Sequence, residues 1–207
     1  HSAGYAARGG PFEMVQLWVN LPAKDKMAPA HYQGITDAQI PAVALPDGAG
    51  QVRVIAGAYG AAKGPARTFT PMNVWDMRLK AGRSLSLELA EGHTAALFVL
   101  HGALRIGAHT VRAAELAVLE REGTELAVET TEDAVVLLLS GAPLNEPIVG
   151  HGPFVMNTQA EIMQALQDYR RTRFGGWPWP DDAPVHGRDP ARFARHPDGR
   201  VERPAEA

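Results

Sequence analysis

Apolar and polar residues alternate with a period of two along several short stretches of the chain. In residues 14–20 (MVQLWVN), the aliphatic residues Val15, Leu17 and Val19 alternate with Gln16, Trp18 and Asn20, which predicts a half-buried strand. The same alternation predicts strands at residues 51–56, 72–79 and 84–89. Continuous apolar runs, which suit strands buried on both faces, occupy residues 95–100 and 134–140.

Glycines mark the turns between these strands. Gly102, Gly107 and Gly123 each stand where one predicted strand must give way to the next. Many short strands at this spacing predict a mainly β sandwich or barrel. Periodicity alone leaves jelly-roll, immunoglobulin-like and lipocalin-like forms open.

One segment has helical periodicity. Across residues 158–172, Thr158 and Glu161 have the spacing of a capping box, and Ile162, Leu166 and Tyr169 share one face. The sequence therefore predicts a single short helix near the C-terminal end of the barrel.

Gly175 and Gly176 are expected to end this helix. The chain from Trp177 onward is rich in Pro, Arg, His and Asp, a composition that buries little surface and predicts a polar tail. Trp177 and Trp179 are candidates for pinning the first tail residues to the barrel.

The charge balance and the absence of cysteine narrow the functional classes. Twenty Lys and Arg against 23 Asp and Glu give a net charge of -3, so direct nucleic-acid binding is not expected. Without cysteine there are no disulfides, and a cytoplasmic location is the expectation. No apolar run approaches the roughly 20 residues of a membrane span and no signal peptide is recognisable, so membrane association is not expected either.

Two sequence blocks carry a resemblance to a known family. The first is residues 16–27 (QLWVNLPAKDKM), followed by Tyr32-Gln33, and it resembles the stretch that joins the two cupin barrels of pirins. The second is residues 143–147 (PLNEP), continuing into 151–158 (HGPFVMNT), and it is similar to the pirin signature before the C-terminal helix. The chain is thus identified as a member of the pirin family, and it is expected to be N-terminally truncated because the early His-x-His motif of pirins would lie before His1.

The resemblance implies a mainly β fold, a cupin barrel (a double-stranded β-helix or jelly roll) with a short C-terminal helix. The expected organisation is the end of the N-terminal cupin and the inter-barrel linker at 1–35, the C-terminal pirin barrel at 36–157, the C-terminal helix at 158–176 and the polar, Pro-rich tail at 177–207.

The resemblance also implies where a metal would bind. Pirins hold one Fe(II) in the N-terminal barrel through three histidines and one glutamate. His1 matches the third histidine and is the candidate metal ligand, but Ala3 stands where the glutamate is expected. A methyl group does not coordinate a metal, so we expect this chain by itself to bind no iron. Two other readings stay open: His1 as an unordered chain end, and Glu13 as the source of the carboxylate.

The second barrel is expected to lack a metal site. Counting back from the turn at Gly102, three of the positions where metal-binding cupins have ligands fall near Glu88, Ala90 and Ala95. The fourth falls at Leu126. Three of these four residues have no ligand atom, which predicts a packed, metal-free barrel.

The remaining histidines have spacings that are not those of metal ligands. Those in or near the barrel and linker are expected at the surface, in turns or in structural roles: His31, His93, His101, His109 and His151. The two in the tail, His186 and His196, are not assigned to a site.

Two functional classes follow from the resemblance. The first is a metal-dependent dioxygenase of the quercetin 2,3-dioxygenase type, acting on a small aromatic, flavonol-like substrate. The second is a non-catalytic, metal-responsive regulatory cupin that binds a protein partner. A third reading is a structural barrel without its companion domain. The complete protein is expected to be a monomer, whereas this chain is expected to be less soluble or to form a dimer through residues 14–20.

Overall fold

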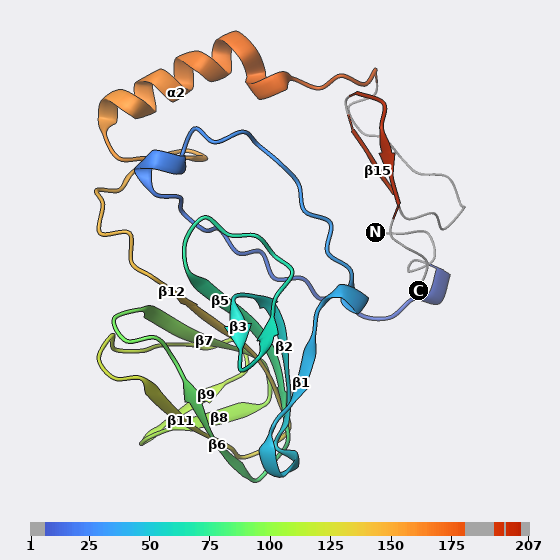
Figure 1. The fold of residues 1–207 in the computed structure, drawn as a ribbon, viewed down its shortest axis with the longest axis vertical. Coiled ribbons are helices and arrows are strands. Elements are labelled where there is room, and N and C mark those ends of the chain that lie inside the picture. Colours follow the sequence, from blue (N-terminus) through green and yellow to red (C-terminus); the bar gives the residue numbers. More distant parts are fainter. Residues whose placement is uncertain (1–6, 181–192, 197, 204–207) are drawn as a thin grey trace. The chain divides into compact units, whose positions relative to one another are not determined.

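A computed structural model describes residues 7–180, 193–196 and 198–203 of the chain. Contacts between residues separate it into two units, one formed by Lys24–Asn145 and one by the described residues of 1–23 and 146–207. The first unit contains the strands β1 to β12, and the second contains the helix α2 (Figure 1).

Two antiparallel sheets make up the first unit. The larger has the strand order β1-β2-β5-β12-β7-β10, and the smaller has the order β6-β11-β8-β9. The strands of the larger sheet are β1 (Ala42–Ala44), β2 (Gly50–Ala56), β5 (Met72–Leu79), β7 (Thr94–His101), β10 (Leu116–Val118) and β12 (Ala134–Gly141). Those of the smaller sheet are β6 (Arg83–Glu88), β8 (Ala103–Ile106), β9 (His109–Arg112) and β11 (Glu125–Thr130).

Shorter elements connect these strands. A hairpin of β3 (Ala58–Tyr59) and β4 (Ala62–Lys63) follows β2. Single turns of 3-10 helix are η1 (Ala23–Asp25), η2 (Asp37–Gln39) and η3 (Pro46–Gly48). The predicted strands at 51–56, 72–79, 84–89, 95–100 and 134–140 are confirmed as β2, β5, β6, β7 and β12.

The core lies between the two sheets and consists of the side chains that alternate inward. Strands β7 and β12 contribute Leu97, Val99, Val136 and Leu138, all fully buried. Burying a side chain of this size contributes roughly 1.5–3 kcal/mol, so the alternating inner faces supply most of the driving force for the barrel.

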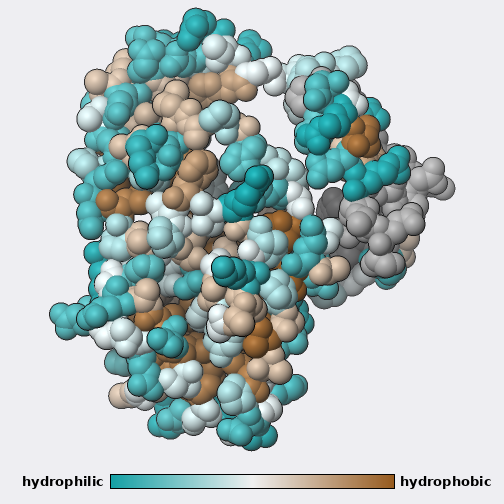
Figure 2. Space-filling view, in the orientation of Figure 1, coloured by the Kyte–Doolittle hydropathy of each residue, from teal (hydrophilic) through white to brown (hydrophobic). Residues whose placement is uncertain are grey.

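The outer face of the larger sheet differs from the prediction that the apolar runs are buried on both faces. Leu139 of β12 and Phe98 of β7 point outward and are only partly buried. On the face shown in Figure 2, apolar residues reach the surface of the barrel unit in patches between polar ones. The continuous apolar runs therefore fill one face completely and leave the other in part accessible.

The turn between β7 and β8 requires a glycine. Gly102 has φ of 77°, and an added Cβ would lie 2.2 Å from the backbone oxygen of Asp133. A side chain there would combine a left-handed backbone with a clash against main-chain atoms, so the glycine keeps the strands in register.

The second unit is built around one hairpin and one helix. The hairpin pairs β13 (Val149–His151) with β14 (Phe154–Met156), and α2 (Gln159–Thr172) and η4 (Arg173–Gly175) follow. Short strands β15 (Ala194–Arg195) and β16 (Val201–Glu202) pair later in the chain.

The predicted helix is confirmed, and it ends at Thr172, the last residue of the predicted range. The Thr158 hydroxyl accepts a hydrogen bond from the Glu161 amide at 3.2 Å, as the capping spacing indicated. The helix stops at Thr172 because Arg173 takes a left-handed conformation with φ of 49°. The left-handed Arg173, rather than Gly175 or Gly176, therefore ends the helix, and the glycines follow in η4 and just after it.

The strand predicted at residues 14–20 is absent. The segment has no regular structure, and Trp18 is 70% exposed. Alternation predicts which face a strand would bury, but a strand forms only when another strand accepts its backbone hydrogen bonds, and none of the described strands pairs with it.

Two further expectations concern membranes and the tail. None of the described helices is long and apolar enough to cross a bilayer.

Trp177 and Trp179 contact each other, with ring centroids 4.5 Å apart. Their predicted docking onto the barrel stays a prediction, and residues 181–192 lie outside the described part of the chain.

Candidate functional site

The predicted metal ligand lies outside the described residues. His1 and Ala3 both belong to residues 1–6, so the assignment of His1 as a ligand stays a prediction. Within the described ranges, no group of three or more His, Asp or Glu side chains is arranged to hold a metal ion.

The interior of the barrel is closed to metal coordination by its side chains. On β6 the inward residues are Leu85 and Leu87, and Leu87 is 1% exposed. Glu88, at the end of β6, and Ala90, just after it, face solvent. The count of ligand positions is therefore off by one residue here, and Leu87 and Leu89 face the interior instead. A shift of one residue exchanges the two faces of a strand.

The other two counted positions are inside the barrel as predicted. Ala95 on β7 and Leu126 on β11 are both buried. Together with Leu87 and Leu89 they present only hydrocarbon to the interior. A metal ion needs nitrogen, oxygen or sulfur ligands, so the residues of the described barrel do not fit one.

One polar atom in the interior was not foreseen. Trp75 on β5 is 2% exposed, and its Nε1 has no hydrogen-bond partner among the described residues. The ring of Tyr59 meets it edge to face, with centroids 5.2 Å apart. The indole N–H is a donor only, so this atom adds no metal ligand.

The guanidinium of Arg53 pairs with two acidic side chains, one in the larger sheet and one in the turn before it. Arg53 on β2 forms ion pairs with both Asp76 on β5 and Asp37 in η2. Asp76 is 8% exposed, and one of its oxygens has no partner among the described residues. Pairing with a guanidinium lowers the cost of burying this carboxylate and makes the group a structural one.

The described histidines of the linker, the barrel and the hairpin lie at the surface or in turns. His101 and His109 are exposed at strand ends, and His31 and His151 are exposed in the linker and the hairpin. His93 is half-buried in the turn before β7. The remaining two are in the tail: His196 Nε2 lies 3.3 Å from Glu202 Oε2, and His186 is outside the described residues.

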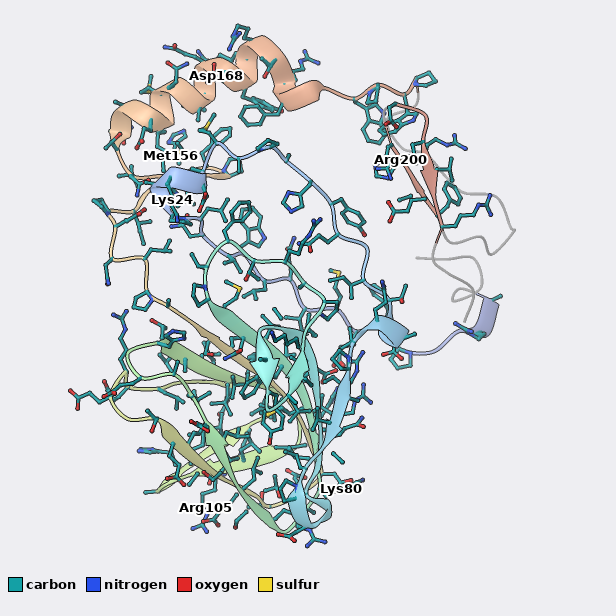
Figure 3. All side chains as sticks on the ribbon, in the orientation of Figure 1. Lys24, Lys80, Arg105, Met156, Asp168 and Arg200 are labelled. Atoms are coloured by element: carbon teal, nitrogen blue, oxygen red, sulfur yellow. The ribbon has the colours of Figure 1, made fainter. Side chains whose placement is uncertain are left out.

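The two family blocks meet at one carboxylate. Glu146 Oε2 accepts a hydrogen bond from the Ala23 amide at 2.7 Å and another from Asn157 Nδ2 at 3.1 Å. Asn157 Nδ2 also donates to the Pro147 carbonyl at 3.0 Å. Met156, labelled in Figure 3, ends the hairpin strand that leads directly to this asparagine. The motif residues thus form a structural junction within the second unit.

A second motif residue acts in the barrel unit. The Gln33 side chain donates to the Arg67 carbonyl at 2.9 Å and accepts from the Arg67 amide at 2.8 Å. The amide group therefore pairs with a backbone as a neighbouring strand would, and it fixes the linker to the segment between β4 and β5.

An aromatic cluster joins the hairpin to the helix end. Phe154, Tyr169 and Phe174 pack edge to face, with centroid separations of 6.2, 5.9 and 5.5 Å. Phe174 reaches this position because its backbone, like that of Arg173, is left-handed, with φ of 50°. Such a conformation is unfavourable for a side-chain residue, so the packing of the cluster must stabilise it.

These contacts were missed because the partners are distant in the sequence. Ala23 and Glu146 are 123 residues apart, and Gln33 and Arg67 are 34 apart. The only local signal was the capping spacing of Thr158 and Glu161, which identified one end of the junction.

Comparison with known proteins agrees with this structure. The family description "Pirin C-terminal cupin domain" matches residues 74–175. A Pseudomonas aeruginosa protein named "putative quercetin 2,3-dioxygenase" is 53% identical over 84% of this chain. Human pirin is 35% identical over 80% of the chain.

A solved structure shows the same fold. The structure of a quercetin 2,3-dioxygenase from Acinetobacter baumannii is 48% identical, with a TM-score of 0.73 over 76% of this chain. The chain spans 61% of the Pseudomonas protein, 58% of human pirin and 55% of the Acinetobacter chain. The mainly β cupin fold with one C-terminal helix is therefore confirmed, and the chain belongs to the pirin family.

Proposed function

We propose that this chain provides the second, metal-free barrel of a two-barrel dioxygenase that acts on flavonol-type substrates such as quercetin. The observation that carries the proposal is the interior of the barrel, where the side chains of Leu87, Leu89, Ala95 and Leu126 are buried or partly buried and offer only hydrocarbon. The 53% identity to a "putative quercetin 2,3-dioxygenase" supports the reaction class.

In this proposal the described residues supply structure. The iron expected for the family would activate dioxygen and the substrate, but none of the described residues fits it, so no step of the reaction is assigned to them. Their contribution is a rigid barrel and, through Glu146 and Asn157, a fixed path for the two family blocks.

A second function, a non-catalytic cupin that binds a protein partner, is favoured by one residue. The family resemblance places a glutamate ligand at position 3, where this chain has Ala3. A three-histidine site lacks the negative charge of the carboxylate, so it would hold Fe(II) more weakly and at a different potential.

The two functions can be separated with a chimera. The N-terminal part of the Pseudomonas relative would be fused to this chain with Ala3 or with the Ala3→Glu substitution. Iron content and oxygen uptake with quercetin are then measured. The dioxygenase proposal expects turnover in both proteins, faster with Glu. Turnover only after Ala3→Glu would favour the non-catalytic alternative, and no turnover in either protein would contradict the dioxygenase proposal.

A further inference from the structure

Strand β10 forms an open edge of the larger sheet. It pairs with β7 on one side, and no described strand pairs with its other side. Leu116 is 54% exposed and Val118 is 67% exposed on the outer face, while Ala117 packs against the core. An apolar strand at a sheet edge is a template for another strand.

The backbone of β10 shows which groups face outward. The Val99 amide donates to the Glu115 carbonyl at 3.1 Å, and the Leu119 amide donates to the Ala95 carbonyl at 2.9 Å. In an antiparallel strand, the backbone groups of every second residue form hydrogen bonds with the same neighbouring strand. The backbone groups of Ala117 therefore face β7, like those of Glu115 and Leu119. The N–H and C=O groups of Leu116 and Val118 therefore point away from the sheet.

The other edges of the two barrel sheets are less suited to association. Edge β1 exposes only alanines, and edges β6 and β9 expose polar or charged residues, which oppose pairing. These exposed residues are Ala42 and Ala44 on β1, Ser84, Ser86 and Glu88 on β6, and His109, Thr110 and Arg112 on β9. Of the edges described, β10 is the one that combines outward backbone groups with large exposed apolar side chains.

We propose that β10 pairs antiparallel with β10 of a second copy of this chain, about a two-fold axis at Ala117. In this register Leu116 of one copy lies opposite Val118 of the other. Both residues have outward backbone groups, so the two symmetric pairs form four hydrogen bonds. The side chains of Leu116 and Val118 then meet on one face, beside Phe98, which is opposite Leu116 on β7.

Charge at the ends of the strand favours the same pairing. With the axis at Ala117, Glu115 of one copy lies opposite Leu119 of the other, and Arg121 follows in the bend two residues later. One carboxylate oxygen of Glu115 accepts from the Arg112 amide of its own chain at 2.7 Å, which leaves the other oxygen for the arginine. The two-fold axis gives two such pairs, and Glu115 and Arg121 are both exposed. This complementarity is specific to a second copy of the chain.

The short edge limits the strength of the dimer. A stable interface buries about 800 Å² on each partner, and a strand of three residues with its neighbours offers less. A dimer in exchange with monomer is therefore expected.

Sedimentation across a concentration series tests the proposal on the 207-residue chain. The wild type is expected to show a reversible monomer–dimer equilibrium, and Val118→Lys is expected to weaken it at least tenfold because two lysines would meet near the axis. Ala42→Lys, on the opposite edge of the same sheet, is the matched control and should leave the equilibrium unchanged. Circular dichroism checks that each variant is folded.

Three results would overturn the proposal. They are a wild type that is monomeric throughout, an equal effect of Val118→Lys and Ala42→Lys, and a dimer that Trp18→Glu dissociates while Val118→Lys does not. The last would show association through residues 14–20.

Amide exchange supplies an independent readout. Protection of the Leu116 and Val118 amides should rise with protein concentration, whereas the Ala117 amide, which faces β7, should be protected at every concentration. A dimer that leaves the Leu116 and Val118 amides unprotected would also overturn the proposal.

Discussion

Replacing Glu146 with alanine tests whether its carboxylate holds the two family blocks together. The change removes the hydrogen bonds from the Ala23 amide at 2.7 Å and from Asn157 Nδ2 at 3.1 Å. Hydrogen bonds to charged groups contribute about 1.5–3 kcal/mol each, and partial exposure puts these two near or below the lower limit. We therefore expect Glu146→Ala to cost roughly 2 kcal/mol, and Glu146→Gln, which keeps a neutral acceptor oxygen, about half as much.

The effect should be confined to the second unit, since Glu146, Ala23 and Asn157 all belong to it. Native-state hydrogen exchange is measured for the Ala23 amide and for the amides of α2 at several urea concentrations. The exchange rates give the free energy of local opening of the second unit. The amide of Val136 in the barrel core should exchange as in the wild type.

Glu91→Ala is the matched control, because Glu91 is an exposed glutamate in the turn before β7. The reasoning is refuted if Glu146→Ala differs from the wild type by no more than Glu91→Ala does. It is also refuted if the alanine and glutamine variants of Glu146 lose equal stability, since the neutral acceptor oxygen of glutamine would then contribute nothing.

Three further predictions concern single contacts. Gln33→Ala should speed exchange of the Arg67 amide by about fivefold, because it removes a hydrogen bond that contributes about 1 kcal/mol, and unchanged exchange would contradict this role. Arg173→Gly should stabilise the second unit by up to about 1 kcal/mol in urea unfolding, because glycine tolerates the left-handed conformation; destabilisation would show that the arginine side chain matters more. Hydrogen bonds from Lys80, labelled in Figure 3, and from the Ala81 amide lower the pKa of Asp133 below its ordinary value of 3.8. Its stabilisation is therefore present above about pH 4 and lost as pH falls toward the folded-state pKa, so thermal melts of the wild type and Asp133→Asn should converge below pH 4, and a constant difference would argue against it.

The barrel strands were predictable because burial on one face leaves a local signature. The inward residues of β2, Val52 and Val54, alternate with outward Arg53, and this alternation is visible without any knowledge of the neighbouring strand. The helix was predictable for the same reason, since its capping residues lie within one turn.

The failures share a different physical cause. Residues 14–20 have the alternation of a strand, but pairing depends on a partner that the alternation does not specify. On β6, counting through the turn before β7 missed the register by one residue, which exchanged Glu88 for Leu87 on the inner face. The junction at Glu146 depends on an amide 123 residues away, and no local pattern reports such a contact.

The central claim, that this barrel is a structural and not a metal-binding cupin, is tested most directly by metal analysis. The 207-residue chain and its His1→Ala variant would be loaded with Fe(II) without oxygen, dialysed and analysed for iron together with protein. The account predicts far less than one equivalent of iron in both proteins, because the described residues include no group of His, Asp or Glu side chains arranged to hold a metal. One tightly held equivalent that survives His1→Ala would contradict it.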